Sequence, residues 1–220
     1  TKSKATSTQI KTLIDKQVFE EYHYQTDRIQ FQDSDDDAST ELNTYQETAL
    51  EEIDDLFETK NIVLLHGVTS SGKTEIYVKM IESILAEGKQ ALYLVPEIAL
   101  TSQLVQRLQK YFGNQIAVYH SRYSQNERLE VWNHVLNQSE NARVVIGARS
   151  SVFLPFSNLG LVIVDEEHEQ SYKQFDPSPR YHARDTAIVL AALFKAKTLL
   201  GSATPSLESF YNATKEHKFG

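Results

Sequence analysis

The segment GVTSSGKT, residues 67–74, constrains the fold of this chain more than any other feature. It matches the pattern G-x-x-x-x-G-K-[S/T], follows the apolar run NIVLL and opens a helical pattern, which is the context that this motif requires. Gly67 and Gly72 let the main chain curl so that its N–H groups point at phosphate oxygens. Lys73 is expected to reach the β- and γ-phosphates of a nucleotide, and the Thr74 hydroxyl to bind Mg²⁺. The motif therefore predicts a nucleoside triphosphate site.

From Leu42 onward, short and continuous apolar runs alternate with helical patterns. We predict strands at 61–67, 90–96, 115–120, 142–147, 159–166 and 198–204, with helices near 73–87, 98–112, 124–138 and 180–195. Apolar strands separated by helices are typical of a mostly parallel sheet that helices cover on both faces. The predicted fold class is therefore α/β, with sites expected at the carboxyl ends of the strands.

An acidic motif, DEEH at residues 165–168, follows the apolar strand LVIV. Asp165 is placed to hold Mg²⁺ opposite Thr74, directly or through water. Glu166 is placed to orient and deprotonate an attacking water, so that metal binding and general-base catalysis fall to different carboxylates. An acidic cluster after a strand is more often a solvated loop, but the phosphate-binding motif makes hydrolysis the stronger interpretation.

Three further residue groups are weaker signals. In GSATPS, Ser202 and Thr204 could hydrogen-bond His168 or Glu166, although this segment is also a plausible turn. Arg149 in GARSS suits a phosphate group and is a candidate DNA contact, with a structural arginine about equally plausible. Gln46 could read an adenine edge because an amide both donates and accepts, but the residues alone favour a surface glutamine on an acidic helix.

The segment after DEEH mixes aromatic and cationic side chains, a composition that suits nucleic-acid bases and phosphates. Aromatic faces stack on bases without regard to sequence, at about 1–3 kcal/mol per base. We expect some of these side chains to pack into the domain instead. The candidates are Tyr172, Phe175 and Tyr181 for bases and Lys173, Arg180 and Arg184 for phosphates.

The net charge of −8 is unevenly distributed. Residues 1–58 hold 5 Lys/Arg and 15 Asp/Glu, whereas residues 59–220 hold 17 and 15, so net charge does not exclude a nucleic-acid partner. The absence of cysteine excludes disulfides and thiolate metal sites in this chain. Apolar runs such as residues 186–194 are too short to span a bilayer, and no membrane partner is expected.

Together, GVTSSGKTEIY, VPEIALTSQ, GARSSVFLPF, VDEEHEQSYKQ, PRYHARD and GSATPS resemble superfamily 2 helicases, and among them the primosomal replication-restart DNA helicases. The resemblance covers about residues 42–220. It implies a RecA-like fold and an ATP- and Mg²⁺-dependent 3′-to-5′ DNA helicase that acts at stalled forks in replication restart and primosome assembly. It also implies a cytoplasmic protein, with single-stranded and forked DNA, primosome and replisome-loading proteins, and single-stranded DNA-binding protein as partners. Zinc is expected only in a C-terminal part that this chain lacks.

Residue by residue, the resemblance implies these roles: Gln46 reads adenine, Lys73 and Thr74 bind phosphate and Mg²⁺, Asp165 binds the metal, Glu166 is the base, and Ser202 and Thr204 couple hydrolysis to motion. The resemblance also implies that the aromatic segment after DEEH is a loop that senses single-stranded DNA and communicates with the acids Asp165 and Glu166.

The expected organisation is a winged-helix remnant or tail at residues 1–32, an acidic linker at 33–41 and the first RecA-like lobe at 42–220, with the second lobe absent. Such a lobe lacks the arginine finger of the second, so we expect it to hydrolyse almost no ATP alone. Two alternatives stay open. One is another superfamily 2 translocase or an RNA helicase lobe, and the other is a nucleotide-gated DNA-binding adaptor.

Overall fold

The computed structural model describes Thr12, Lys16 and residues 41–69, 71–121 and 123–220. The chain divides into two compact units, Thr1–Gln30 and Phe31–Gly220, and the second contains the fold described below. The predictions for residues 1–32 and 33–41 lie outside the described residues, apart from Thr12, Lys16 and Glu41.

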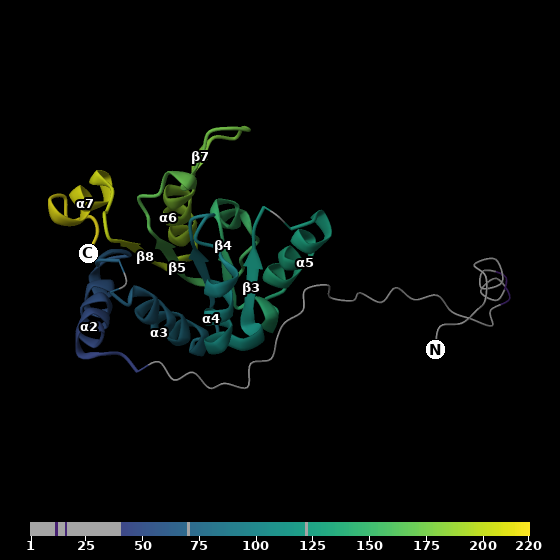
Figure 1. Ribbon diagram of the computed structural model, residues 1–220, viewed down its shortest axis with the longest axis horizontal. Coiled ribbons are helices and arrows are strands. Elements are labelled where there is room, and N and C mark those ends of the chain that lie inside the picture. The colour runs from purple at the N-terminus through teal and green to yellow at the C-terminus, as the bar shows by residue number, and fades with distance from the viewer. Residues whose placement is uncertain (1–11, 13–15, 17–40, 70, 122) are drawn as a thin grey trace. The chain divides into compact units, whose positions relative to one another are not determined.

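A six-stranded sheet forms the centre of the second unit, and all of its pairings are parallel. The strands lie in the order β1-β8-β5-β2-β4-β3. Figure 1 labels four of them, β8, β5, β4 and β3, in this order. They are β1 (Ile62–His66), β2 (Gln90–Leu94), β3 (Ile116–Tyr119), β4 (Val144–Gly147), β5 (Leu159–Asp165) and β8 (Lys197–Ser202). Strands β2 and β4 are buried along their whole length, as expected of central strands covered on both faces. All six predicted strands are confirmed.

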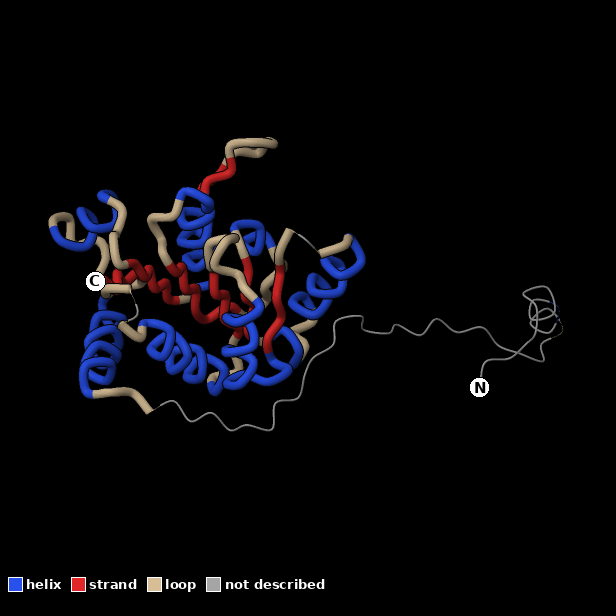
Figure 2. The backbone as a smooth tube through the Cα atoms, in the orientation of Figure 1, coloured by secondary structure: helices blue, strands red, loops and turns tan. Residues whose placement is uncertain are grey.

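Helices cover the sheet on two sides. The structure has α2 (Thr44–Thr59), α3 (Lys73–Ala86), α4 (Ser102–Phe112), α5 (Gln125–Leu136), α6 (Ala183–Phe194) and α7 (Leu207–Thr214). The crossovers through α3 and α6 run in opposite directions along the sheet, so right-handed connections place these two helices on opposite faces. Figures 1 and 2 show α3 and α4 on one side and α6 on the other. The four predicted helices are confirmed as α3 to α6.

Capping residues explain where two of the helices begin. Asn43 accepts hydrogen bonds from the main chain at the start of α2, and Gln46 bonds back to Asn43, which completes a capping box. Ser124 and Glu127 form the same arrangement at the start of α5. No helix in the described part of the chain is long and apolar enough to cross a bilayer.

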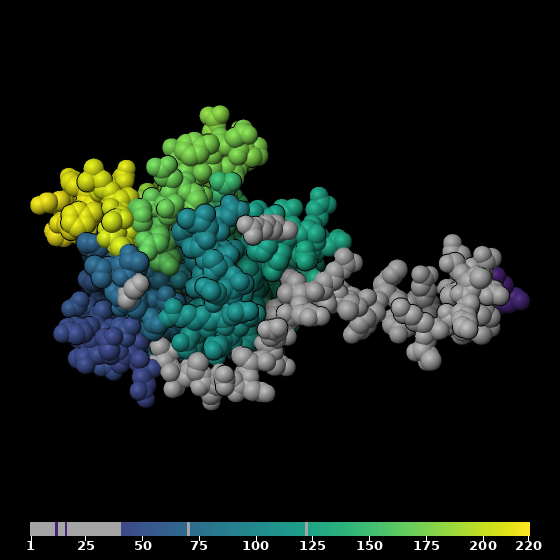
Figure 3. All heavy atoms as spheres, in the orientation of Figure 1, coloured from purple at the N-terminus to yellow at the C-terminus, as the bar shows by residue number. Residues whose placement is uncertain are grey.

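Helix α7 and a two-stranded antiparallel hairpin were not predicted. The hairpin pairs β6 (Lys173–Gln174) with β7 (Tyr181–His182) and stands away from the sheet (Figure 2). In the space-filling view it forms a protrusion above the body of the domain (Figure 3). Its strands are too short to carry a hydrophobic period, which is why the sequence pattern did not reveal them.

The strand order brings the predicted motifs together. Strands β1, β8 and β5 are neighbours, and the segments that follow them are GVTSSGKT, ATPS and EEH. Because parallel strands end at the same edge of the sheet, these three segments meet there although they lie far apart in the sequence.

Candidate functional site

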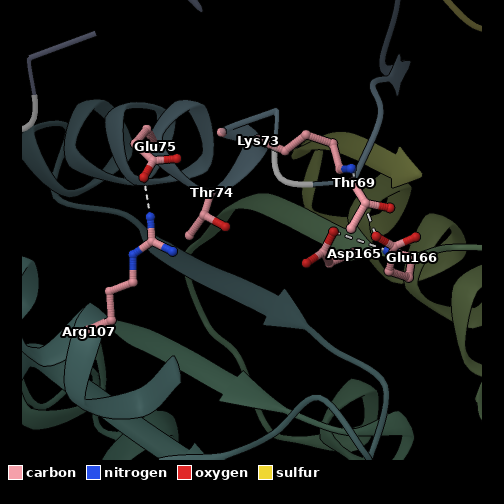
Figure 4. Close-up of a pocket in the computed structure, with 8 residues that line it drawn as sticks. Thr69, Lys73, Thr74, Glu75, Arg107, Asp165 and Glu166 are labelled. Carbon is pink, nitrogen blue, oxygen red and sulfur yellow. Dashed lines mark hydrogen bonds and ion pairs between the residues drawn. The ribbon is translucent and has the colours of Figure 1, made fainter. Parts of the chain in front are cut away.

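A cavity of about 290 Å³ opens at this edge of the sheet (Figure 4). It is lined by Thr69, Gly72, Lys73, Thr74, Glu75, Arg107, Asp165 and Glu166. Five predicted site residues therefore line one cavity: Gly72, Lys73, Thr74, Asp165 and Glu166. Its lining is mostly polar and charged, which suits a hydrophilic ligand.

Lys73 is held at the mouth of the phosphate-binding loop. Its Nζ donates to the carbonyl oxygens of Gly67 at 2.9 Å and Val68 at 3.3 Å, and the residue is buried. These are neutral acceptors, whereas a phosphate oxygen is charged and forms a stronger hydrogen bond with an ammonium group. The loop thus keeps a cation in place that an anionic ligand can recruit.

Gly72 is required at the turn into α3. Its φ of +82° is left-handed, and a Cβ there would lie 2.1 Å from Nε2 of Gln46. Gln46 is buried; its Nε2 donates to the Gly72 carbonyl at 3.1 Å and its Oε1 accepts from Asn43 N–H at 2.8 Å. Gln46 therefore lies against the phosphate-binding loop and not on an open helix surface.

Two tyrosines that sequence reasoning missed orient Asp165. The Tyr77 hydroxyl donates to Oδ1 at 3.1 Å and the Tyr93 hydroxyl donates to Oδ2 at 3.2 Å. Burial and the neighbouring charge of Glu166 raise the pKa of Asp165, while the two tyrosines and Lys73 counteract part of that rise. Tyr77 lies one helical turn beyond Lys73, and Tyr93 pairs with Ile163 of β5. The spacing from Lys73 and the pairing of β2 with β5 are therefore what place these two tyrosines beside Asp165.

Glu166 has an unusual backbone conformation, with φ at +47°. A left-handed conformation costs a non-glycine residue about 1 kcal/mol or more, and such residues gather at functional sites. Here it turns the side chain toward the cavity, with Oε1 at 3.8 Å from Lys73 Nζ. The acid and the lysine are close enough to act on one ligand.

The predicted hydrogen bonds from GSATPS to His168 are confirmed. The hydroxyl of Ser202 lies 2.8 Å from His168 Nδ1, and that of Thr204 lies 3.2 Å from Nε2. His168 Nδ1 is also 3.7 Å from Glu166 Oε2, and the Gly67 N–H donates to the Ser202 carbonyl at 3.1 Å. Strand β8 thus contacts both the phosphate-binding loop and the acidic motif.

The donor set fits Mg²⁺ bound together with a nucleotide. Mg²⁺ prefers oxygen ligands and is usually held by one or two protein groups plus substrate phosphates and water. The Thr74 hydroxyl and the Asp165 carboxylate face the same cavity. Among the described residues no group of three or more His, Asp or Glu side chains could hold a metal ion.

Glu167, the third acid of DEEH, is at the centre of a buried network that the sequence did not predict. Its carboxylate accepts hydrogen bonds from Ser206 N–H at 2.6 Å, Ser209 Oγ at 2.9 Å and Arg184 Nη1 at 2.8 Å. Burial alone would raise the pKa of Glu167, but these hydrogen bonds outweigh it and the pKa is lowered. The network joins the acidic motif to the first turns of α6 and α7.

The structure corrects two of the predicted DNA contacts. Arg184 is largely buried and its guanidinium is committed to Glu167 and Asp185, which leaves it poorly placed for a phosphate of DNA. Tyr172 is 1% exposed, and its hydroxyl donates to the Asp165 main-chain carbonyl at 2.6 Å. Its ring cannot offer a face to a base, so the prediction that it stacks on DNA is wrong.

The other predicted DNA contacts lie on or beside the hairpin. Phe175 is 59% exposed, and the Lys173 ammonium lies 4.8 Å from its ring centroid. Arg180 is exposed, and Tyr181 is half-buried. Arg149 is half-buried on the η3 turn (Arg149–Phe153), where Nη1 reaches the Lys173 carbonyl at 3.5 Å.

Phe153 belongs to this surface although sequence reasoning did not select it. It is 49% exposed and packs edge-to-face on Tyr181, with ring centroids 4.9 Å apart. The available signal in the sequence was a phenylalanine four residues after Arg149 in the segment GARSSVFLPF. The hairpin and the η3 turn together present aromatic and cationic groups on one surface, called here the hairpin surface: Arg149, Phe153, Lys173, Phe175, Arg180 and Tyr181.

Arg107 is a further cavity residue that the sequence did not indicate. It extends from α4 and forms an ion pair with Glu75 in the first turn of α3. Figure 4 shows this pair at the end of the cavity away from Asp165 and Glu166. Arg107 lies between the motifs, in a helix whose sequence pattern indicated only side chains that pack against the sheet.

Comparison with known proteins agrees with this arrangement. The chain is 45% identical over 218 residues to the replication restart protein PriA of Bacillus subtilis, covering 97% of this chain and 27% of that protein. It is 54% identical over 172 residues to the replication restart protein PriA of Haemophilus influenzae, covering 78% of this chain and 23% of that protein. The chain thus spans about a quarter of the length of these curated relatives.

A solved structure and a family model also match this chain. The structure of RecG bound to a three-way DNA junction matches 82% of this chain and 23% of that chain, with a TM-score of 0.58 and 25% identity. The family model described as DEAD/DEAH box helicase matches residues 43–212. With its phosphate-binding loop, its acidic motif and its parallel sheet, the chain belongs to the DEAD/DEAH box helicase family.

Proposed function

We propose that residues 42–220 are the ATP-binding motor lobe of a 3′-to-5′ DNA helicase that acts at stalled replication forks. The observation that carries this proposal is the convergence of Lys73, Thr74, Asp165 and Glu166 on one cavity. A lysine, a hydroxyl, a metal-binding acid and a second acid are among the groups that nucleotide hydrolysis requires. Family membership and the identity to the replication restart relatives support the biological setting.

In the proposed mechanism the phosphate-binding loop and Lys73 bind the triphosphate. Lys73 exchanges the carbonyl oxygens of Gly67 and Val68 for phosphate oxygens, which bear more negative charge. Thr74 and Asp165 would hold Mg²⁺, which would neutralise part of the phosphate charge. The hydroxyls of Tyr77 and Tyr93 hold Asp165 in a single orientation for this task.

Glu166 is the proposed general base. It orients a water molecule against the terminal phosphate and accepts a proton from it. His168, hydrogen-bonded to Ser202 and Thr204, lies beside Glu166, so a shift of β8 can change the position of the base. We assign His168, Ser202 and Thr204 to the coupling of hydrolysis with motion, and Gln46 to adenine.

The hairpin surface is the proposed contact for single-stranded DNA. Phe153, Phe175 and Tyr181 offer aromatic faces and edges, and Arg149, Lys173 and Arg180 offer charge for phosphates. The hairpin follows the acidic motif directly, and Tyr172 at its base bonds to the Asp165 carbonyl. A DNA strand that moves the hairpin can therefore move the acids of the nucleotide site.

The wider setting also belongs to this proposal. We include as partners forked and single-stranded DNA, primosome and replisome-loading proteins and single-stranded DNA-binding protein, and we propose a cytoplasmic location. Similarity to the replication restart relatives supports this setting. The winged-helix remnant at residues 1–32, the acidic linker at 33–41 and zinc in a further C-terminal part remain predictions. A second RecA-like lobe is proposed to complete the cleft and to supply an arginine finger.

The test is ATP hydrolysis by the complete protein without nucleic acid, with single-stranded DNA, with forked DNA and with RNA. We expect stimulation by DNA that Phe175→Ala reduces, while basal hydrolysis stays the same because Phe175 lies outside the cavity. Equal stimulation by RNA would favour a broader helicase activity. Binding of DNA with no turnover under any condition would favour a nucleotide-gated adaptor.

A further inference from the structure

Arg107 stands in the wall of the nucleotide cavity without a role in the mechanism above. Its side chain is 47% exposed and pairs with Glu75, whose side chain is 23% exposed. The pair bridges α4 and α3 across the end of the cavity that lies away from Glu166 (Figure 4). A ligand that fills the cavity meets this ion pair.

The ion pair matters because Glu75 is an acid in a cavity that is proposed to bind phosphates. An uncompensated carboxylate would repel a triphosphate, and Arg107 cancels that charge. The hydrogen bond from Nη2 to Glu75 uses one of five guanidinium donors, so others are available to an anion. Arginine matches the geometry of phosphate oxygens better than lysine because its donors form a planar fork.

The neighbours of Gly72 show which part of a nucleotide this end of the cavity would hold. A Cβ at Gly72 would lie 2.1 Å from Gln46 Nε2 and 3.2 Å from Glu75 Oε2, so Gln46 and Glu75 flank the same glycine. Lys73 Nζ and Glu166 form the other end, 3.8 Å apart. With the terminal phosphate between Lys73 and Glu166, the α-phosphate points toward Glu75 and Arg107.

We propose that Arg107 is a nucleotide-binding residue that contacts the α-phosphate, held in position by Glu75. This inference rests on the proposed nucleotide site and adds a specific contact to it. Arg107 serves both ATP and ADP, because both carry an α-phosphate, and it does not sense whether the terminal phosphate is present.

The test is isothermal titration calorimetry of the complete protein with MgATP and MgADP. We expect Arg107→Ala to weaken both nucleotides by a similar factor of about tenfold, the size of one charge-assisted hydrogen bond. Arg107→Lys should retain part of the affinity. Lys110→Ala, which removes an exposed cation from the same helix, should bind like the wild type.

The double variant Arg107→Ala with Glu75→Gln separates direct contact from charge cancellation. If Arg107 binds the phosphate, the double variant stays weak. Full recovery would overturn the proposal, because Arg107 would then only neutralise Glu75. A loss confined to ATP would also overturn it, by placing Arg107 at the terminal phosphate. If Arg107→Ala binds nucleotide normally while Lys73→Ala binds it weakly, the Arg107 contact is refuted and the nucleotide site is not. If the wild type binds no nucleotide, both the nucleotide site and the Arg107 contact are refuted.

Discussion

The hydroxyl of Tyr172 donates a 2.6 Å hydrogen bond to the main-chain carbonyl of Asp165. It joins the start of the hairpin to the end of β5, where the proposed metal-binding acid lies. Burial first, and then the negative charges of Asp165 and Glu166, raise the pKa of Tyr172, so the hydroxyl stays protonated and remains a donor. The aromatic segment therefore has two parts, a buried tyrosine that braces the acids and an exposed surface that faces outward.

Tyr172→Phe removes this brace and leaves the ring in place. We expect the free energy of unfolding to fall by about 1–2 kcal/mol, because the Asp165 carbonyl loses a buried partner. Denaturant unfolding measures this loss. Phe175→Ala is the matched control, since its exposed ring should cost little stability. Equal stability of Tyr172→Phe and the wild type would mean that the hydrogen bond does not hold the segment.

Gly72→Ala tests the close approach of Gln46 to the phosphate-binding loop. Gly88 has a similar φ, +76°, but a Cβ there would have no neighbour within 4 Å, so Gly88→Ala isolates the backbone cost of about 1–2 kcal/mol. Gly72→Ala should lower the stability of the fold more than Gly88→Ala does, because the new methyl would lie 2.1 Å from Gln46. It should also weaken ATP binding. Thermal unfolding and calorimetry of both variants give the comparison. Equal losses would show that the loop relaxes freely around Gln46.

Glu167→Ala should be strongly destabilising, by about 3–5 kcal/mol, since it leaves the Arg184 guanidinium without its buried partner. The control is Asp185→Asn, which removes the other, exposed acid on Arg184 and should cost at most about 1 kcal/mol. Chemical denaturation distinguishes them. If the free energy of unfolding fell by similar amounts in the two variants, the buried network around Glu167 would not be a main support of α6 and α7.

We predict that His182, in β7, makes the free energy of unfolding depend on pH. Burial, and then the charge of Arg184, lower its pKa below the ordinary value of about 6.5. The unfolded chain therefore binds a proton more readily, so this part of the stability is present above about pH 6.5 and is lost as the pH falls toward the lower pKa of the folded state. Unfolding at pH 7.5 and 5.5 should show a smaller loss in His182→Gln than in the wild type. A larger loss in the variant would contradict the sign.

Much of the fold followed from the sequence because its signals are local. Continuous apolar strands, the glycines of the phosphate-binding loop and the acid after β5 each identify an element without knowledge of its neighbours. The pairing of Tyr77 and Tyr93 with Asp165 depends instead on which strands and helices become adjacent, and the same is true of Arg107 with Glu75. Tyr172 was misjudged because composition reports aromatic character but not the direction in which a ring points.

The most direct test of the account separates nucleotide binding from hydrolysis. Glu166→Gln and Lys73→Ala are compared with the wild type in the complete protein, by calorimetry with MgATP and by DNA-stimulated phosphate release. We predict that Glu166→Gln binds ATP at least as well as the wild type but hydrolyses it about 10² to 10⁴ times more slowly, because only the general base is lost. Lys73→Ala should lose binding. Hydrolysis by Glu166→Gln at the wild-type rate, with ATP bound equally well, would contradict the assignment of Glu166 as the base and with it the proposed catalytic site.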